Sequence, residues 1–153
     1  MPTIPSDLYW MQQAYDLALI ARSQGEVPVG ALLVSEDNQL IGRGWNQVIQ
    51  MNDPTAHAEC LAIRTACAHI HNYRLQNTTL YVTLEPCCMC ASAIVHARIK
   101  RLVFAARDVK AGAAGSVYNL MRGYPLNHQV QMDEGVLQPE CTLLLTEFFK
   151  SRR

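Results

Sequence analysis

The sequence predicts a single α/β domain in which helices cover a mostly buried sheet. Its 153 residues suit one domain, and half of them are hydrophobic, which is enough for a full core. Short apolar, β-branched segments alternate with stretches of helical periodicity. No repeat or linker-like segment divides the chain. We therefore expect residues 1–153 to fold as one unit.

The N-terminal third predicts a helix followed by a β-hairpin. Ser6 can cap a helix that ends near Gly25. The apolar residues that recur at helical spacing between them are Trp10, Ala14, Leu17, Ala18 and Ala21. Residues 29–35 (VGALLVS) and 40–46 (LIGRGWN) then predict two strands joined by the turn EDNQ.

The rest of the chain alternates helix and strand. A second helix is expected over residues 56–71. The side chains expected along one face of it are Cys60, Ile63, Cys67 and Ile70. Residues 79–84 (TLYVTL) predict a buried strand that leads into a third helix, which continues through ASAIVHA. Pro86 suits the first turn of that helix, because its missing N–H would be unpaired there anyway. The remaining expected elements are strands over 101–106 and 130–132 and a closing helix over 139–150.

Composition argues against a secreted or membrane protein. The N-terminus MPTIPSDLYW lacks the basic and apolar regions of a signal peptide, and no apolar run approaches the roughly 20 residues of a membrane helix. Six cysteines without a secretory signal are better explained as reduced thiols or metal ligands than as disulfides. We expect a cytoplasmic protein with no membrane partner.

The charges are unevenly distributed although they cancel overall. Residues 1–97 hold four Lys/Arg and eight Asp/Glu, whereas residues 98–153 hold nine and five. A basic C-terminal third permits a face that binds polyanions. Charges placed for solubility alone explain the asymmetry equally well.

Three thiols stand in the stretch EPCCMC, residues 85–90. In the first turn of a helix, Cys87 and Cys90 are three residues apart, so their sulfur atoms can converge on one ion. Cys88 is rotated by about 100° around the same helix and is expected to face elsewhere. A helix N-terminus also favours the thiolate form that zinc requires.

His57 and Glu59, in the stretch TAHAEC, complete the expected site. His57 begins a helix after a strand, as the Cys87–Cys90 pair does, which places both ligand sets at one edge of the sheet. One histidine and two thiolates leave a fourth position for water, as in catalytic zinc sites. Glu59 suits a proton carrier. Taken singly, His57 and Glu59 would be ordinary surface side chains, but H-x-E with P-C-x-x-C is the zinc-deaminase signature.

Longer stretches narrow this resemblance. The matching stretches are GEVPVGA (25–31), WN (45–46), DPTAHAE (53–59), NYRL (72–75), TLYVTLEPC (79–87), ARDVKAGAAGS (106–116), LNH (126–128) and FF (148–149). They span nearly the whole chain, which resembles the bacterial tRNA-specific adenosine deaminases among the cytidine-deaminase-like zinc hydrolases. Cys88 departs from this pattern, which has an apolar residue there, and the given sequence ends with SRR.

The resemblance implies a three-layer α/β/α sandwich with a central five-stranded mixed sheet, assembled as a homodimer. It implies conversion of adenosine to inosine at the wobble position (34) of a tRNA anticodon stem-loop, with one zinc ion per subunit held by His57, Cys87 and Cys90. Glu59 would carry the protons. Asn46, at the end of its strand, would fix the base edge, although from sequence alone it suits a turn cap better.

RNA contacts are expected from polar and aromatic residues in the second half of the chain. The candidates are Arg107, Asp108, Lys110, Asn127, His128 and Phe149, with Lys150, Arg152 and Arg153 for phosphate. Asp108 would accept a hydrogen bond from a 2′-OH or a base, since an acid does not attract phosphate. Phe149 could equally belong to the core, and the terminal basic residues could be ordinary solvated charges.

Two other functions fit parts of the pattern. A deaminase of a free base or nucleotide, such as guanine or cytosine, would share every zinc residue, but ARDVKAGAAGS and the basic C-terminal third favour RNA. A structural zinc or RNA-binding module would need a fourth protein ligand. Cys88 is the only close candidate, and its expected direction is wrong.

Overall fold

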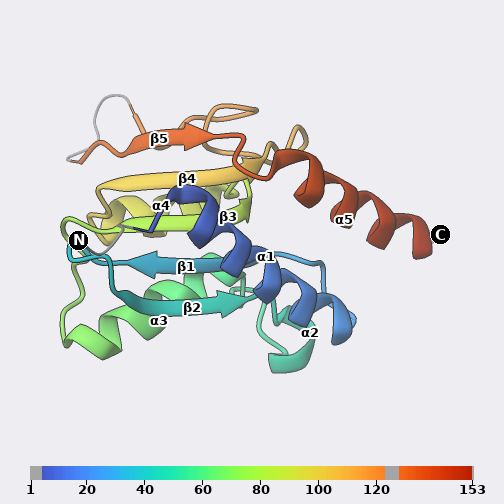
Figure 1. The fold of residues 1–153 in the computed structure, drawn as a ribbon, viewed down its shortest axis with the longest axis horizontal. Coiled ribbons are helices and arrows are strands. Elements are labelled where there is room, and N and C mark those ends of the chain that lie inside the picture. The colour runs from blue at the N-terminus through green and yellow to red at the C-terminus, as the bar shows by residue number, and fades with distance from the viewer. Residues whose placement is uncertain (1–4, 123–127, 153) are drawn as a thin grey trace.

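Five strands form one sheet with helices on both faces (Figure 1). The structure, a computed structural model, describes residues 5–122 and 128–152. The strand order is β2-β1-β3-β4-β5. The strands are β1 (Gly30–Val34), β2 (Leu40–Trp45), β3 (Thr79–Leu84), β4 (Arg101–Ala106) and β5 (Gln131–Glu134).

The sheet is mixed, and its strand directions decide where the functional residues meet. Strand β1 pairs antiparallel with β2 and with β3, while β3, β4 and β5 are mutually parallel. Strands β2, β3 and β4 therefore point the same way, and their carboxyl ends lie at one edge of the sheet. In α/β sheets this edge is where ligands bind.

Two helical layers enclose the sheet. Residues of α3 (Ala58–Ile70) and α4 (Cys88–His96) share one hydrophobic core with one face, and residues of α1 (Asp7–Ser23) and α5 (Gln138–Ser151) share a second core with the other. A short helix α2 (Val48–Met51), which the sequence did not predict, follows β2. The expected three-layer architecture with a five-stranded mixed sheet is confirmed. Among the described residues, no helix has the length and apolar character needed to cross a membrane.

Helix α1 forms as predicted. The Ser6 side chain accepts a hydrogen bond from the backbone N–H of Tyr9, which caps the helix. All five apolar residues expected on its inner face are buried. Gly25, with φ of +77°, follows the helix end and adopts the left-handed conformation that glycine tolerates best.

Helix α3 packs on the sheet mainly through small residues, and Ile63 and Cys67 on its predicted apolar face are partly buried against the same core. The helix buries Ala58, Ala62 and Ala66, while Ile70 is exposed. The reason lies in β2, where a Cβ added at Gly44 would come within 2.6 Å of the Ala58 carbonyl oxygen. Small residues on both sides let α3 lie directly on the strand, which fixes the helix start that carries His57.

Helix α4 begins later than predicted. Cys87 is its N-cap with an extended backbone (φ −74°, ψ 176°), so Pro86 precedes the helix instead of standing in its first turn. The Pro86 carbonyl accepts a hydrogen bond from the Ala113 N–H at 2.8 Å, which holds it to a distant segment instead of the helix. Pro139 stands in the first turn of α5, close to its predicted place.

Candidate metal centre and active site

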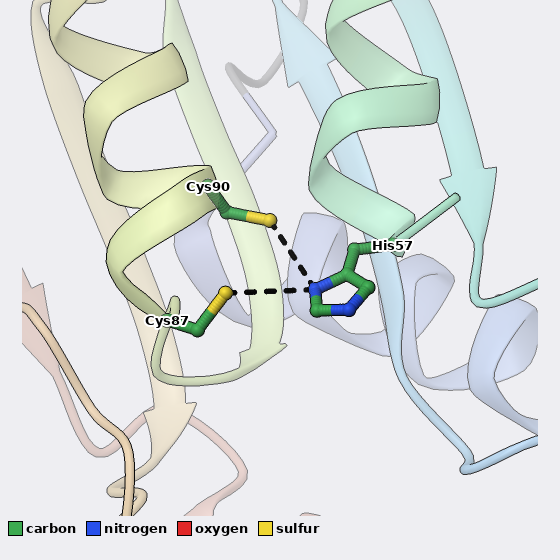
Figure 2. A group of neighbouring side chains, drawn as sticks. All are labelled: His57, Cys87 and Cys90. Carbon is green, nitrogen blue, oxygen red and sulfur yellow. Dashed lines mark hydrogen bonds between the residues drawn. The ribbon is translucent and has the colours of Figure 1, made fainter. Parts of the chain in front are cut away.

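Three ligand-type side chains meet where two helices begin. His57 is the N-cap of α3, Cys87 is the N-cap of α4, and Cys90 lies in the first turn of α4. Figure 2 shows the His57 ring directed at both sulfur atoms. The two helices follow β2 and β3, whose carboxyl ends share one edge of the sheet, so chain segments 30 residues apart converge.

The geometry of this cluster fits a tetrahedral zinc ion. His57 Nδ1 lies 3.6 Å from Cys87 Sγ and 3.5 Å from Cys90 Sγ. Ligands at ordinary Zn–N and Zn–S bond lengths, seen from the metal at the tetrahedral angle, would be about 3.6 Å apart. All three ligand atoms lie within 4.8 Å of one another. The donor set of one imidazole and two thiols is also one that zinc prefers.

The protein environment favours a thiolate at Cys87. Hydrogen bonds from the Cys90 thiol and then from His57 lower the pKa of Cys87 to about 3. The pKa of Cys90 lies above its ordinary value, because Cys60 and Cys87 hydrogen-bond to it and because it is buried. The pKa of His57 is raised, chiefly by its hydrogen bond with Cys87. A bound divalent cation would favour the deprotonated form of both thiols.

The other nearby cysteines do not join the cluster. Cys88 is exposed and is not among the mutually close ligand atoms, which agrees with the expectation that it faces away from the ion. Cys60 Sγ lies 3.7 Å from Cys90 Sγ, but it is not one of the mutually close ligand atoms. Within residues 5–122 and 128–152, no fourth His, Cys, Asp or Glu completes this group. The arrangement is that of an open metal site, which suits catalysis better than structural support.

Glu59 lies beside the cluster in a buried position. Its side chain is only 4% exposed, and it lines the same cavity as His57 and Cys87. Burial is the main cause that raises its pKa to about 7. A carboxyl group with this pKa can accept and release a proton near neutral pH, which is what a proton carrier needs.

A cavity of about 190 Å³ opens onto these residues. Asn46, just after β2, forms part of the cavity wall. Its Oδ1 atom is buried and has no hydrogen-bond partner among the described residues. Its Nδ2 group donates to the Val27 carbonyl at 3.3 Å, which fixes the amide orientation. The cavity is smaller than the roughly 300–1,000 Å³ of drug-sized pockets, so it suits one small ligand group.

Of the predicted RNA contacts in 107–110, only Asp108 lines the cavity. Asp108 Oδ1 accepts hydrogen bonds from the N–H groups of Lys110 and Ala111, so part of its carboxylate shapes its own turn. Arg107 forms two hydrogen bonds of 2.7 Å with Glu134, although its side chain is largely exposed. Lys110 is exposed.

The remaining candidates lie apart from the metal centre or beyond the described residues. His128 Nε2 lies 2.6 Å from the Ile99 carbonyl oxygen, before β4 and thus at the opposite edge of the sheet. Phe149 is 49% exposed, and its neighbour Phe148 is the one that packs into the core. Arg152 lies against the Gly25 carbonyl at 3.3 Å, and Lys150 is exposed. Asn127 and Arg153 lie outside the described residues.

Two buried carboxylates beside the site were missed by the sequence reasoning. Glu85 lines the cavity and is 2% exposed. Glu26 is 1% exposed and accepts hydrogen bonds from the N–H groups of Ile49 and Gln50, at the start of α2. In both cases the sequence feature that could have indicated a buried carboxylate was an acidic residue close to an apolar strand: Glu85 in LEP and Glu26 in GEVPV.

The family match agrees with this geometry. Residues 5–106, about two thirds of the chain, match the family described as the cytidine and deoxycytidylate deaminase zinc-binding region. The matched residues include all three ligand candidates and Glu59. The fold and the site therefore define a zinc-dependent deaminase of the cytidine-deaminase class.

Close relatives narrow the class. The chain is 53% identical to the tRNA-specific adenosine deaminase of Haemophilus influenzae over 143 residues, which cover 94% of this chain and 83% of that protein. The chain belongs to the tRNA-specific adenosine deaminase family.

Solved structures of other deaminases share this fold. A structure from studies of A-to-I editing by tRNA:A34 deaminases at the wobble position of transfer RNA superposes with a TM-score of 0.86 at 41% identity, covering 90% of this chain and 99% of that chain. A guanine deaminase from Bacillus subtilis superposes with a TM-score of 0.62 at 32% identity, covering 94% and 91%.

Proposed function

We propose that this protein deaminates adenosine to inosine at the wobble position of tRNA anticodon loops. The observation that carries the proposal is the cluster of His57, Cys87 and Cys90 beside a buried Glu59 in one small cavity. The substrate assignment is supported by relatives named tRNA-specific adenosine deaminase and by the A34-deaminase structure.

His57, Cys87 and Cys90 would hold the zinc ion, one in each subunit. Zinc supplies Lewis-acid activation of water when it is bound at such a site. Glu59 would take a proton from the attacking water and deliver it to N1 of adenine as C6 is attacked. It would then take the proton of the new C6 hydroxyl group and deliver it to the amine at C6, which leaves as ammonia while the C6 carbonyl forms. The buried position of Glu59 next to the cluster supports this role.

Asn46 would orient the substrate in the cavity. Its buried Oδ1 atom has no partner among the described residues, so an N–H or O–H of the substrate would satisfy it. Its amide nitrogen already donates to Val27, so the oxygen is the end of the amide that still lacks a partner among the described residues. This arrangement favours a donor on the substrate over an acceptor.

RNA binding would involve exposed residues around the cavity. Asp108 lines it, Lys110 follows on the same segment, and Arg152 contacts Gly25, which is two residues from the cavity residue Val27. Phe149 is exposed and available for stacking. Arg107 would have to break its hydrogen bonds with Glu134 before it could bind a phosphate.

The oligomeric state and the cellular location are proposed from the family resemblance and from the substrate. We propose that residues 1–153 act as one deaminase domain in a cytoplasmic homodimer. The dimer rests on the family resemblance, and the location rests on the tRNA substrate. Sedimentation of the zinc-replete protein would test the dimer directly.

The test compares substrates on one zinc-replete preparation. The protein is incubated with an anticodon stem-loop carrying adenosine at the wobble position, with a matched stem-loop in which that adenosine is moved by one nucleotide, and with free guanine. Inosine in the first stem-loop alone supports the proposal. Ammonia from guanine with no inosine in either stem-loop overturns it in favour of a free-base deaminase.

A further inference from the structure

Glu85 lies in the wall of the same cavity as the metal-centre residues His57 and Cys87. It follows β3 directly, is 2% exposed and forms part of the cavity wall. Its backbone N–H donates to the Ala106 carbonyl at 2.8 Å, at the end of β4. The residue is therefore fixed to the sheet edge where the ligands of the metal centre gather.

Both oxygen atoms of the Glu85 carboxylate accept hydrogen bonds from one segment that is distant in the sequence. Oε1 accepts hydrogen bonds from the Asp108 N–H at 3.1 Å and from the Ser116 hydroxyl. Oε2 accepts from the N–H groups of Ala114 and Ser116, both at 3.0 Å. A carboxylate offers about four acceptor positions, so little remains for a substrate.

The same segment, residues 108–116, closes tightly over this carboxylate. A Cβ added at Gly112 would lie 2.4 Å from Glu85 Cδ and 2.5 Å from Oε2, so only glycine fits there without movement. The Ala113 N–H also donates to the Pro86 carbonyl. The backbone N–H groups of the 108–116 segment thus converge on a protein carboxylate instead of a substrate phosphate.

We propose that Glu85 is a positioning residue that holds the 108–116 segment against the cavity and thereby sets Asp108 and Lys110 for the RNA substrate. The inference rests on the proposed function and adds a residue to it. Glu85 acts through the segment, since its oxygen atoms are occupied by it. Its influence should therefore fall on substrate binding more than on the chemical step.

Two substitutions test the contact from opposite sides. Glu85→Gln keeps the size but turns an acceptor oxygen into an NH₂ group that faces backbone N–H donors. Gly112→Ala leaves Glu85 intact and pushes the segment away from it. Leu144→Ala, in the buried face of α5, is the control for general loss of stability.

The direct readout is backbone hydrogen exchange measured by NMR. In the wild type, the amides of Asp108, Ala114 and Ser116 should be protected. In Glu85→Gln and in Gly112→Ala they should exchange at least about tenfold faster, while the amides of β3 and β4 keep their protection. Unchanged exchange of these three amides in Glu85→Gln would overturn the proposal, whatever the activity.

The second readout is kinetic. Both variants should retain one zinc per chain and raise KM for the stem-loop at least about fivefold, with a smaller change in kcat, because the segment must be ordered on binding. The double variant should resemble either single variant instead of multiplying their effects. A KM equal to that of Leu144→Ala would overturn the positioning role. Failure of the proposed function would differ, since the wild type itself would make no inosine.

Discussion

Asn46→Ala should weaken catalysis while leaving the protein about as stable as before. In the free protein the buried Oδ1 atom has no hydrogen-bond partner among the described residues. Such an acceptor destabilises a fold by about 1–3 kcal/mol. Removing the side chain relieves this cost, but it also removes the hydrogen bond to Val27 at 3.3 Å, worth about 0.5–1.5 kcal/mol.

These two contributions act in opposite directions and partly offset each other. We expect the free energy of unfolding to change by less than about 1 kcal/mol. Activity should respond differently, because one lost substrate hydrogen bond of about 1.4–2.8 kcal/mol lowers kcat/KM by about 10- to 100-fold. Urea denaturation and inosine formation, measured on one zinc-replete preparation, give both quantities.

Asn72→Ala is the matched control for Asn46→Ala. The Asn72 Oδ1 atom accepts a hydrogen bond from the Arg74 N–H at 2.9 Å in an exposed turn. Its loss should reduce stability slightly and leave kcat/KM unchanged. An Asn46→Ala variant that unfolds about 3 kcal/mol more easily but keeps full activity would refute the reasoning, since Asn46 would then be a structural amide.

Three further predictions concern the metal, the pH and the salt concentration. Cys90→Ser should lose zinc on dialysis against a weak chelator, whereas Cys88→Ser should keep one zinc per chain; equal retention by both would refute the ligand assignment. The hydrogen bond with Arg101 lowers the pKa of Asp7, so its contribution to stability is present above the unfolded pKa near 4 and disappears as the pH falls through the folded value. Asp7→Asn should therefore reduce the urea midpoint at pH 7 more than at pH 3, and a pH-independent difference would contradict this. RNA affinity should fall as salt rises, with a shallower slope in Lys110→Gln; a flat response in the wild type would exclude a phosphate-binding role.

The sequence was informative where local chemistry decides the structure. The cap at Ser6, the hairpin of β1 and β2 and the strand before EPCCMC follow from residues within a few positions of one another. His57 and Cys87 could be paired because both begin a helix after a strand. Residue type then limited the metal, since an imidazole with two thiols favours zinc.

The sequence was uninformative where a contact joins distant segments. The buried face of α3 depends on glycines in β2, and helical periodicity alone does not show which partner a helix packs on. The sequence suggested Arg107 as an RNA contact and did not show that Glu134, 27 residues later, binds it. Glu85 received no role because its four donors lie 23 to 31 residues away.

The most direct test of the whole account measures inosine in an anticodon stem-loop with adenosine at the wobble position, using zinc-loaded wild type and zinc-loaded Glu59→Ala in parallel. Nucleoside mass spectrometry gives the product, and metal analysis confirms equal zinc in both proteins. We expect inosine from the wild type and essentially none from Glu59→Ala. Near-normal inosine from the variant would remove the proton carrier from the mechanism, and no inosine from folded, zinc-replete wild type would contradict the assigned reaction.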